Sequence, residues 1–327
     1  MKHRRWARLA IALGLMWLAA GCGGLDKAGQ SRADRDAGLP ELRAVKLAAA
    51  AKLRVVATTA IVGDVVGNVG GEAISLTILM GPGQDPHSYQ PTPQDVALVE
   101  KAHVVFVNGF HLEEGLEATI EAVADRGGPT VSVSAGITPR PGGDEHAGSQ
   151  PAGDPHVWFD PAHVKTWARN IETTLSALDP ANAAIYRANA AAYTRELDEL
   201  DAAIRSQVAA IPPERRKLVT DHDVFGYFAE RYDFTLVGAV IPAFSTTAEA
   251  SAGELADLIG KIRAERAPAV FVGASVNPKA AAAVAAETGI PVIRLYTGEL
   301  GAAGSGAETY LGMMRMNVEA LAKALGR

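Results

Sequence analysis

Short runs of hydrophobic residues alternate with longer amphipathic stretches along the first half of the chain, from residue 53 onward. The short runs are rich in Val, Ile and Leu without regular polar alternation, which is typical of strands buried on both faces of a parallel sheet. In the longer stretches, hydrophobic residues recur every three or four positions, and this spacing predicts helices packed on the sheet. We expect strands at 53–59, 74–80, 103–109 and 130–136, and helices at 61–71, 92–102 and 111–125.

The second half of the chain repeats this alternation. Ser251 and Glu254 stand three positions apart at the start of one amphipathic stretch, which is the pattern of a capping box at a helix N-terminus. Four strands interleaved with helices in each half predict two similar α/β lobes. We expect the second set of strands at 217–221, 235–241, 268–274 and 291–296, and its helices at 224–232, 251–266, 278–289 and 309–325.

A longer helical pattern separates the two sets, roughly from residue 180 to residue 211. About 30 residues of helix would be ~45 Å long, and Pro212 and Pro213 end the pattern. An ordinary packed helix would fit this pattern, but the length favours a stiff connection between the lobes. The stripe that faces one side comprises Tyr186, Asn189, Tyr193, Leu197, Leu200, Ile204 and Val208.

The chain has 327 residues, of which 48% are hydrophobic and 21% charged, so it is long enough to form two medium-sized domains with a sizeable core. The patterns predict an α/β fold with two similar lobes, each a four-stranded, mostly parallel sheet flanked by helices, joined by one long connecting helix. We expect the N-terminal lobe at 53–179, the connecting helix at 180–211 and the C-terminal lobe at 212–327.

The beginning of the chain has a different character. Basic residues precede a hydrophobic run at 9–20, which is the organisation of a secretory signal. The run is shorter than the roughly 20 residues that a membrane-spanning helix needs. Residues 18–22 resemble a bacterial lipoprotein box, in which the cysteine is lipidated, and Cys22 is the only cysteine of the chain. We therefore expect a lipoprotein signal peptide at 1–21, a flexible tether at 22–52 and no disulfide.

The formal net charge of the chain is −6, and it becomes more negative when the basic leader is removed. An acidic exported protein is a poor binder of nucleic acid, because that binding depends on neutralising phosphates. Negative charge suits a cationic ligand, although net charge alone does not identify a binding site.

The tripeptide Asp-Pro-His occurs twice, with its histidines at His87 and His156, and a third histidine, His222, follows a predicted strand. Ligands of open parallel sheets bind beyond the carboxyl ends of the strands. Proline restricts the backbone before each of the first two histidines, and a nearby carboxylate can orient the ring. Each histidine alone would be interpreted as a hydrogen-bonded loop residue, but the three together favour a metal site. The carboxylates available to orient them are Asp85, Asp154, Asp160, Asp221 and Asp223.

A tetrahedral zinc ion would need a fourth ligand. The last predicted strand is followed by residues 294–301, in which Glu299 is the only carboxylate. Glu299 is therefore the candidate for the fourth ligand.

Five stretches of the chain resemble the zinc/manganese solute-binding lipoproteins of bacterial metal-importing ABC transporters. They match in order and spacing, and the resemblance runs from about residue 53 to the C-terminus. The two Asp-Pro-His motifs are its most specific part. The stretches are GPGQDPHSYQPTPQDV, NGFHLEEGLE, DPHVWFDP, TDHDVFGYFAERY and LYTGELGAAGSGAETYLGMMRMNV.

The resemblance implies two α/β lobes joined by one long helix, and it implies His87, His156 and His222 as the first three metal ligands. Manganese-binding members of the family usually have glutamate at the third position, so a histidine there resembles the zinc branch. Three imidazoles also favour zinc over manganese or iron. Many members have aspartate where this chain has Gly298. The fourth ligand is then either Glu299 or a water molecule.

The family often carries a metal-collecting loop rich in histidine and acidic residues before the second ligand. Of such a loop this chain has only Asp144, Glu145 and His146, and three residues favour a solvated charged loop over a weak metal-collecting one. His103 and His163 are expected to be structural. His111, which is followed by Glu113 and Glu114, is expected to form a polar helix start, with a place near the metal site as the lesser alternative.

We expect an extracytoplasmic, high-affinity zinc-binding protein that delivers the metal to an ABC-type permease and is not an enzyme. The resemblance further implies a monomer anchored by lipid to the outer face of the cytoplasmic membrane, permease subunits as partners and, in some cases, a zinc chaperone. The alternatives are a manganese- or iron-binding member of the same family, and a zinc-dependent extracellular hydrolase. The chain contains no H-E-x-x-H and no G-x-S-x-G motif with an evident triad, which counts against the hydrolase.

Overall fold

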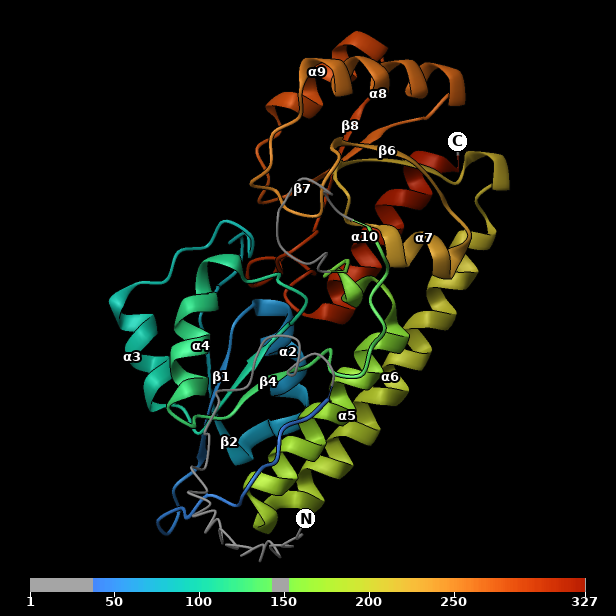
Figure 1. Cartoon of the computed structure of the whole chain (residues 1–327). Coiled ribbons are helices and arrows are strands. Elements are labelled where there is room, and N and C mark those ends of the chain that lie inside the picture. Colours follow the sequence, from blue (N-terminus) through green and yellow to red (C-terminus); the bar gives the residue numbers. More distant parts are fainter. Residues whose placement is uncertain (1–37, 143–152, 327) are drawn as a thin grey trace, which may run out of the picture.

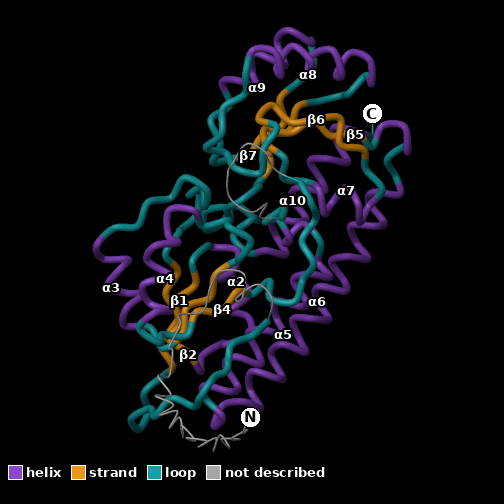
Figure 2. The backbone as a smooth tube through the Cα atoms, in the orientation of Figure 1, coloured by secondary structure: helices purple, strands orange, loops and turns teal. Residues whose placement is uncertain are grey.

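A computed structural model describes residues 38–142 and 153–326. These residues form two lobes, each containing a four-stranded parallel sheet with helices on both faces (Figures 1 and 2). The predicted fold class is confirmed. The strand order is β2-β1-β3-β4 in the N-terminal lobe and β6-β5-β7-β8 in the C-terminal lobe. The strands are β1 (Leu53–Ala57), β2 (Ile74–Ile78), β3 (Val104–Val107), β4 (Thr130–Ser132), β5 (Lys217–His222), β6 (Thr235–Ile241), β7 (Val270–Gly273) and β8 (Val292–Leu295).

The helices fill the intervals between these strands and cover the sheets. Short 3-10 turns at Gly71–Ala73, Glu114–Leu116, Val157–Phe159, Pro180–Asn182 and Pro213–Arg215 adjoin several of them. The α-helices are α2 (Ala60–Gly70), α3 (Pro93–Lys101), α4 (Glu117–Asp125), α5 (Pro161–Leu178), α6 (Ala183–Ala209), α7 (Gly226–Tyr232), α8 (Ala252–Glu265), α9 (Lys279–Thr288) and α10 (Tyr310–Leu325).

Each sheet is buried on both faces, as the hydrophobic runs predict. In the N-terminal lobe, Val56 and Val105 pack toward α3 and α4, whereas Val55 and Phe106 pack in the large core that includes α2 and α5. The C-terminal lobe has the same arrangement, with α8 and α9 on one face and α7 and α10 on the other. The large core is continuous between the lobes because α6 and α10 contribute to it throughout.

The connecting helix α6 spans 27 residues, which corresponds to about 40 Å. It contacts α5 and α2 in the N-terminal lobe and α10 from the C-terminal lobe, and Figure 1 shows it running along both lobes. The predicted stripe is buried except for Asn189, whose amide donates to the Val69 carbonyl. The helix begins three residues later than predicted, because Pro180–Asn182 forms a separate turn before it.

One predicted helix start is wrong. The helix expected from residue 111 begins as α4 at Glu117, because the backbone before it has left-handed φ angles. These angles are 93° at Gly109, 52° at Phe110 and 66° at His111, and they cannot continue a right-handed helix. The buried Glu113 carboxylate accepts a hydrogen bond from the Asn108 amide (2.6 Å) and so holds this turn in place.

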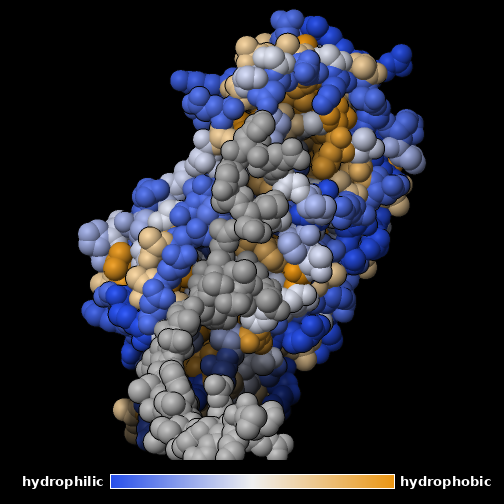
Figure 3. All heavy atoms as spheres, in the orientation of Figure 1, coloured by the Kyte–Doolittle hydropathy of each residue, from blue (hydrophilic) through white to orange (hydrophobic). Residues whose placement is uncertain are grey.

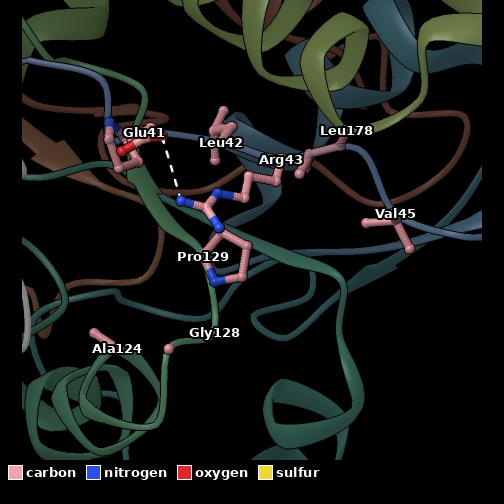
Figure 4. A pocket seen from close by; sticks show the side chains of 10 residues that line it. Glu41, Leu42, Arg43, Val45, Ala124, Gly128, Pro129 and Leu178 are labelled. Carbon is pink, nitrogen blue, oxygen red and sulfur yellow. Dashed lines mark ion pairs between the residues drawn. The ribbon is translucent and has the colours of Figure 1, made fainter. Parts of the chain in front are cut away.

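Residues 38–47, called the strap below, lie against the N-terminal lobe. Leu39, Leu42, Val45 and Leu47 pack on the large core, and the Val45 amide donates to the Leu178 carbonyl at the end of α5 (2.8 Å). The strap and the α4–β4 turn line an open hollow of about 590 Å³ (Figure 4), whose lining includes the exposed ion pair of Arg43 with Glu41. This part of the predicted tether is thus in contact with the lobe.

The described surface is mainly hydrophilic on the face shown in Figure 3, with hydrophobic residues in small groups. Across residues 38–142 and 153–326, no helix combines the length and hydrophobicity needed to cross a membrane.

Candidate metal site

The three predicted histidines converge where the lobes meet. His87 lies in the β2–α3 loop, His156 precedes the turn Val157–Phe159, and His222 is the last residue of β5. One ring nitrogen of each lies within 4.8 Å of one ring nitrogen of both others. The rings are 4%, 1% and 2% exposed, respectively, so the cluster is shielded from bulk water. N-terminal and C-terminal lobes therefore both contribute to one buried group of imidazoles.

The spacing of these nitrogens fits a small ion. The Nε2 atoms of His87 and His156 are 3.1 Å apart. Two nitrogens bound tetrahedrally to zinc at about 2.0–2.1 Å would be about 3.3 Å apart. The ring centroids lie 5.1–5.7 Å from one another, with tilted or edge-on planes.

Carboxylates orient two of the three rings. Nδ1 of His156 lies 2.9 Å from Asp154 Oδ1, and Nδ1 of His222 lies 2.9 Å from Asp221 Oδ1. An Nδ1–H group that donates to a carboxylate leaves the Nε2 lone pair free for a metal. Of the five aspartates that the sequence offered for this role, Asp154 and Asp221 perform it.

The repeated Asp-Pro-His motif forms the same turn twice. Asp85 Oδ1 accepts from the His87 amide (3.1 Å), and Asp154 Oδ1 accepts from the His156 amide (3.0 Å). This is the aspartate turn in which a side chain bonds the backbone two residues on. The motif is therefore a local device that fixes the direction of each histidine.

Burial and nearby charge act differently on the three histidines. Burial lowers the pKa of His87 and lowers the pKa of His156 further. Burial opposes the charged form of His222 as well, but the surrounding carboxylates, Asp221 first and then Asp85 and Asp223, together outweigh it and leave the pKa of His222 above its usual value. In the same network, burial raises the pKa of Asp154 to about 6. His222 is thus the ring that most readily holds a proton.

Glu299 is buried but does not join the histidine group of the described residues. Its carboxylate accepts from the Ser275 amide (2.9 Å) and from the Gly298 amide (3.0 Å), and burial raises its pKa. A Cβ atom at Gly298 would lie 2.9 Å from Pro86 Cδ. Pro86 therefore occupies the space in which a side chain at position 298 would begin.

Two charged residues lie beside the histidines, of which sequence reasoning gave Glu114 only as the lesser alternative for its cluster and missed Arg140 altogether. Glu114 Oε1 faces Nδ1 of His87 at 3.6 Å, too far for a hydrogen bond but close enough to favour a charged ring. Arg140 forms ion pairs with Asp154 (3.0 Å) and with Glu230 of α7 (2.7 Å), and so joins the lobes. No local sequence signal links Arg140 to Glu230, since they lie 90 residues apart.

The other described histidines lie outside the group. His103 Nδ1 accepts from the Arg54 amide (2.9 Å), His111 pairs with Glu117 (2.6 Å), and His163 lies in the first turn of α5. The predicted lipidation site Cys22 and the predicted loop residues Asp144, Glu145 and His146 lie outside the described residues.

A protein-family comparison identifies the group to which this fold and site belong. Residues 55–324 match the family described as ZnuA, zinc-uptake complex component A, periplasmic. The chain belongs to the ZnuA family.

Relatives and solved structures of ZnuA-like proteins agree with this assignment. The manganese-binding lipoprotein MntA of Halalkalibacterium halodurans is 36% identical over 276 residues, covering 84% of this chain and 89% of MntA. The manganese ABC transporter substrate-binding lipoprotein PsaA of Streptococcus pneumoniae is 32% identical over 283 residues, covering 84% of this chain and 90% of PsaA. The structure of the periplasmic zinc-binding protein TroA from Treponema pallidum superposes with a TM-score of 0.78 and 33% identity, covering 85% of this chain and all of TroA.

ZnuA-like proteins are metal-binding solute-binding components of ABC transporters, and they are not enzymes. Such components work with the permease and ATPase parts of a transporter. The family is described as periplasmic and several relatives are named lipoproteins, which confirms the predicted extracytoplasmic, membrane-anchored location. The choice of zinc over manganese does not follow from these names, which include both metals.

Proposed function

We propose that His87, His156 and His222 bind the transported metal, that this metal is zinc, and that the protein delivers it to an ABC-type permease. The observation that carries the proposal is the convergence of three buried imidazoles, two of them oriented by carboxylates. Imidazole nitrogens suit zinc, whereas manganese prefers sites with more carboxylate oxygen. In this proposal the metal is cargo, because the family is one of solute-binding proteins.

Two candidates for the fourth ligand remain in this proposal. Glu299 is one residue from the position where members of the family often carry aspartate, and its carboxylate is buried close to Gly298. Its carboxylate accepts from the Ser275 and Gly298 amides. A water molecule would complete the tetrahedron instead.

Manganese is the second candidate cargo, because MntA and PsaA are both named manganese proteins. We further propose lobes at 53–179 and 212–327 around a connection at 180–211, lipidation at Cys22, a monomeric state and, for Asp144, Glu145 and His146, a weak metal-collecting role. A zinc chaperone that loads the protein is part of the same proposal.

Metal titration of the purified protein tests the zinc proposal. We expect one zinc ion per chain, retained in the presence of excess manganese, and no ester or peptide hydrolysis. His222→Glu is the diagnostic variant, since exchanging an imidazole for a carboxylate should lower the ratio of zinc to manganese affinity by more than about tenfold. Manganese that displaces zinc from the unchanged protein would contradict the zinc assignment and favour the second candidate.

Zinc affinity is expected to fall as the pH is lowered. The surrounding carboxylates, Asp221 first, keep the pKa of His222 above its usual value, so the metal-free protein holds a proton there that zinc must displace. Below that pKa, affinity should fall by about tenfold per pH unit, because one proton leaves for each zinc bound. The fall should steepen at lower pH, where the lowered pKa values of His87 and His156 are reached. Competition with a chelator at a series of pH values measures the dependence.

Asp221→Asn serves as the control for this pH dependence. It removes the largest of the charges that raise the pKa of His222, so the onset of the fall should move to lower pH. A zinc affinity that does not change with pH would show that His222 is not a ligand.

A further inference from the structure

Asp85 connects His87 to the opposite lobe. Its Oδ1 atom accepts from the His87 amide (3.1 Å), while its Oδ2 atom accepts from the Thr246 hydroxyl (2.6 Å). Thr246 belongs to the C-terminal lobe, in the loop between β6 and α8, and is separated from Asp85 by 161 residues. The carboxylate that directs His87 is therefore also bonded across the boundary between the lobes.

A second carboxylate beside His87, that of Glu114, also lies close to the opposite lobe. Its carboxylate faces Nδ1 of His87 (3.6 Å) and is also in contact with the side chain of Ser245. Burial raises the pKa of Glu114, but the contacts with His87 and Ser245 outweigh it and leave the pKa below its ordinary value. Two neighbouring hydroxyl residues of one lobe thus contact the two carboxylates beside His87 in the other.

The rest of this loop segment contacts the surroundings of the other two histidines. The Ala243 carbonyl accepts from the amide of Asp223, the residue after His222 (2.9 Å). The ring of Phe244 is buried and lies edge-on to His156, with 6.3 Å between the centroids. Residues 243–246, called the latch below, consequently touch the neighbourhood of all three histidines.

We propose that the latch positions His87 through Asp85 and that the latch must open before the metal can leave. This proposal rests on the proposed function for its second part, since release presupposes a bound metal. Thr246 is a positioning residue that acts on His87 only through the Asp85 carboxylate. Loops held by a few partly exposed hydrogen bonds open locally at low cost in free energy, so the latch is suited to control exit.

Thr246→Val tests the latch in the metal-free protein, because valine has nearly the same shape as threonine but no hydroxyl. We expect hydrogen exchange of the peptide 84–90, which contains the His87 amide, to become faster by about tenfold, the effect of losing one hydrogen bond to a charged acceptor. Thr235→Val is the matched control, since Thr235 is exposed at the opposite end of β6 and should leave this peptide unchanged. Unchanged exchange in Thr246→Val would overturn the proposal, whether or not the protein binds zinc.

Zinc release tests the second part of the proposal. Transfer of zinc from the loaded protein to an excess of chelator should be about tenfold faster in Thr246→Val than in Thr235→Val. In an Asp85→Ala background, Thr246→Val should cause no further change, because the coupling passes through Asp85. Equal release rates, or effects of the two substitutions that simply add, would overturn control by the latch while the unchanged protein still loads one zinc. Failure of the unchanged protein to load zinc would instead refute the proposed function and, with it, the release part of this inference.

Discussion

Replacing His87, His156 or His222 with alanine is expected to lower zinc affinity by more than about 100-fold, exceeding the 10–100-fold loss typical of residues that only support a ligand. Each ring supplies one of three nitrogens in a buried group, and two nitrogens cannot hold the ion in its tetrahedral position. Isothermal titration or chelator competition at neutral pH measures the affinity of each variant.

Two other histidines provide the controls for this experiment. His103→Ala removes a ring that accepts from the Arg54 amide and lies outside the group, and His146→Ala removes the histidine of the predicted collecting loop. Both variants should retain zinc affinity within about threefold of the unchanged protein, a difference of less than ~0.7 kcal/mol. If all five variants lost affinity equally, the assignment of the site would be wrong.

Gly226→Ala is expected to damage both stability and zinc binding, although no atom of Gly226 touches the proposed metal. A Cβ atom at this position would overlap Nη1 of Arg140 and would lie 2.8 Å from Asp154 Oδ2. Arg140 would have to leave Asp154, a fully buried carboxylate that orients His156. Breaking a buried ion pair costs about 3–5 kcal/mol, and the better helix propensity of alanine returns only about 0.5–1 kcal/mol. Chemical unfolding and zinc titration measure the two effects, the second expected at 10–100-fold.

Gly260→Ala is the matched control for Gly226→Ala. Gly260 is an exposed glycine of α8, and nothing lies within 4 Å of where its Cβ would be. Alanine there should stabilise the protein by about 0.5–1 kcal/mol and leave zinc affinity unchanged. A Gly226→Ala protein that is as stable as Gly260→Ala, and binds zinc as tightly, would show that the Arg140–Asp154 pair is dispensable.

The two-lobed fold could be predicted because its signals are local and repeated. The run at Leu53–Ala57 is hydrophobic except at the exposed Arg54, and the structure buries its successive residues Val55 and Val56 on opposite faces of one sheet. The start of α4 could not be predicted in the same way. The stretch before it has helix-forming composition, but Phe110 and His111 adopt left-handed angles that only the surrounding structure imposes.

The histidine group was predictable because its decisive feature is also local. Asp-Pro-His forms the same turn wherever it occurs, and the repeated motif therefore marked His87 and His156 in advance. The supporting contacts depend on residues far apart in sequence, such as Arg140 with Glu230 and Asp85 with Thr246, and no spacing rule predicts them. Glu299 shows the same limit, since the sequence marked it as a candidate ligand but could not show that its carboxylate accepts from the Ser275 and Gly298 amides.

The packing of the strap on the N-terminal lobe bears on how far the lobes could lie from a lipid anchor at Cys22. If Cys22 carries the anchor as proposed, the chain between it and Gly38 is about 16 residues, which spans at most ~55 Å when fully extended. If Leu39, Leu42, Val45 and Leu47 did not pack on the lobe, the linker would run from Cys22 to Leu53, about 31 residues or at most ~105 Å. The effective concentration of two tethered partners falls with roughly the three-halves power of linker length. The shorter linker would therefore raise the effective concentration of the protein at a transporter in the same membrane by roughly two- to threefold.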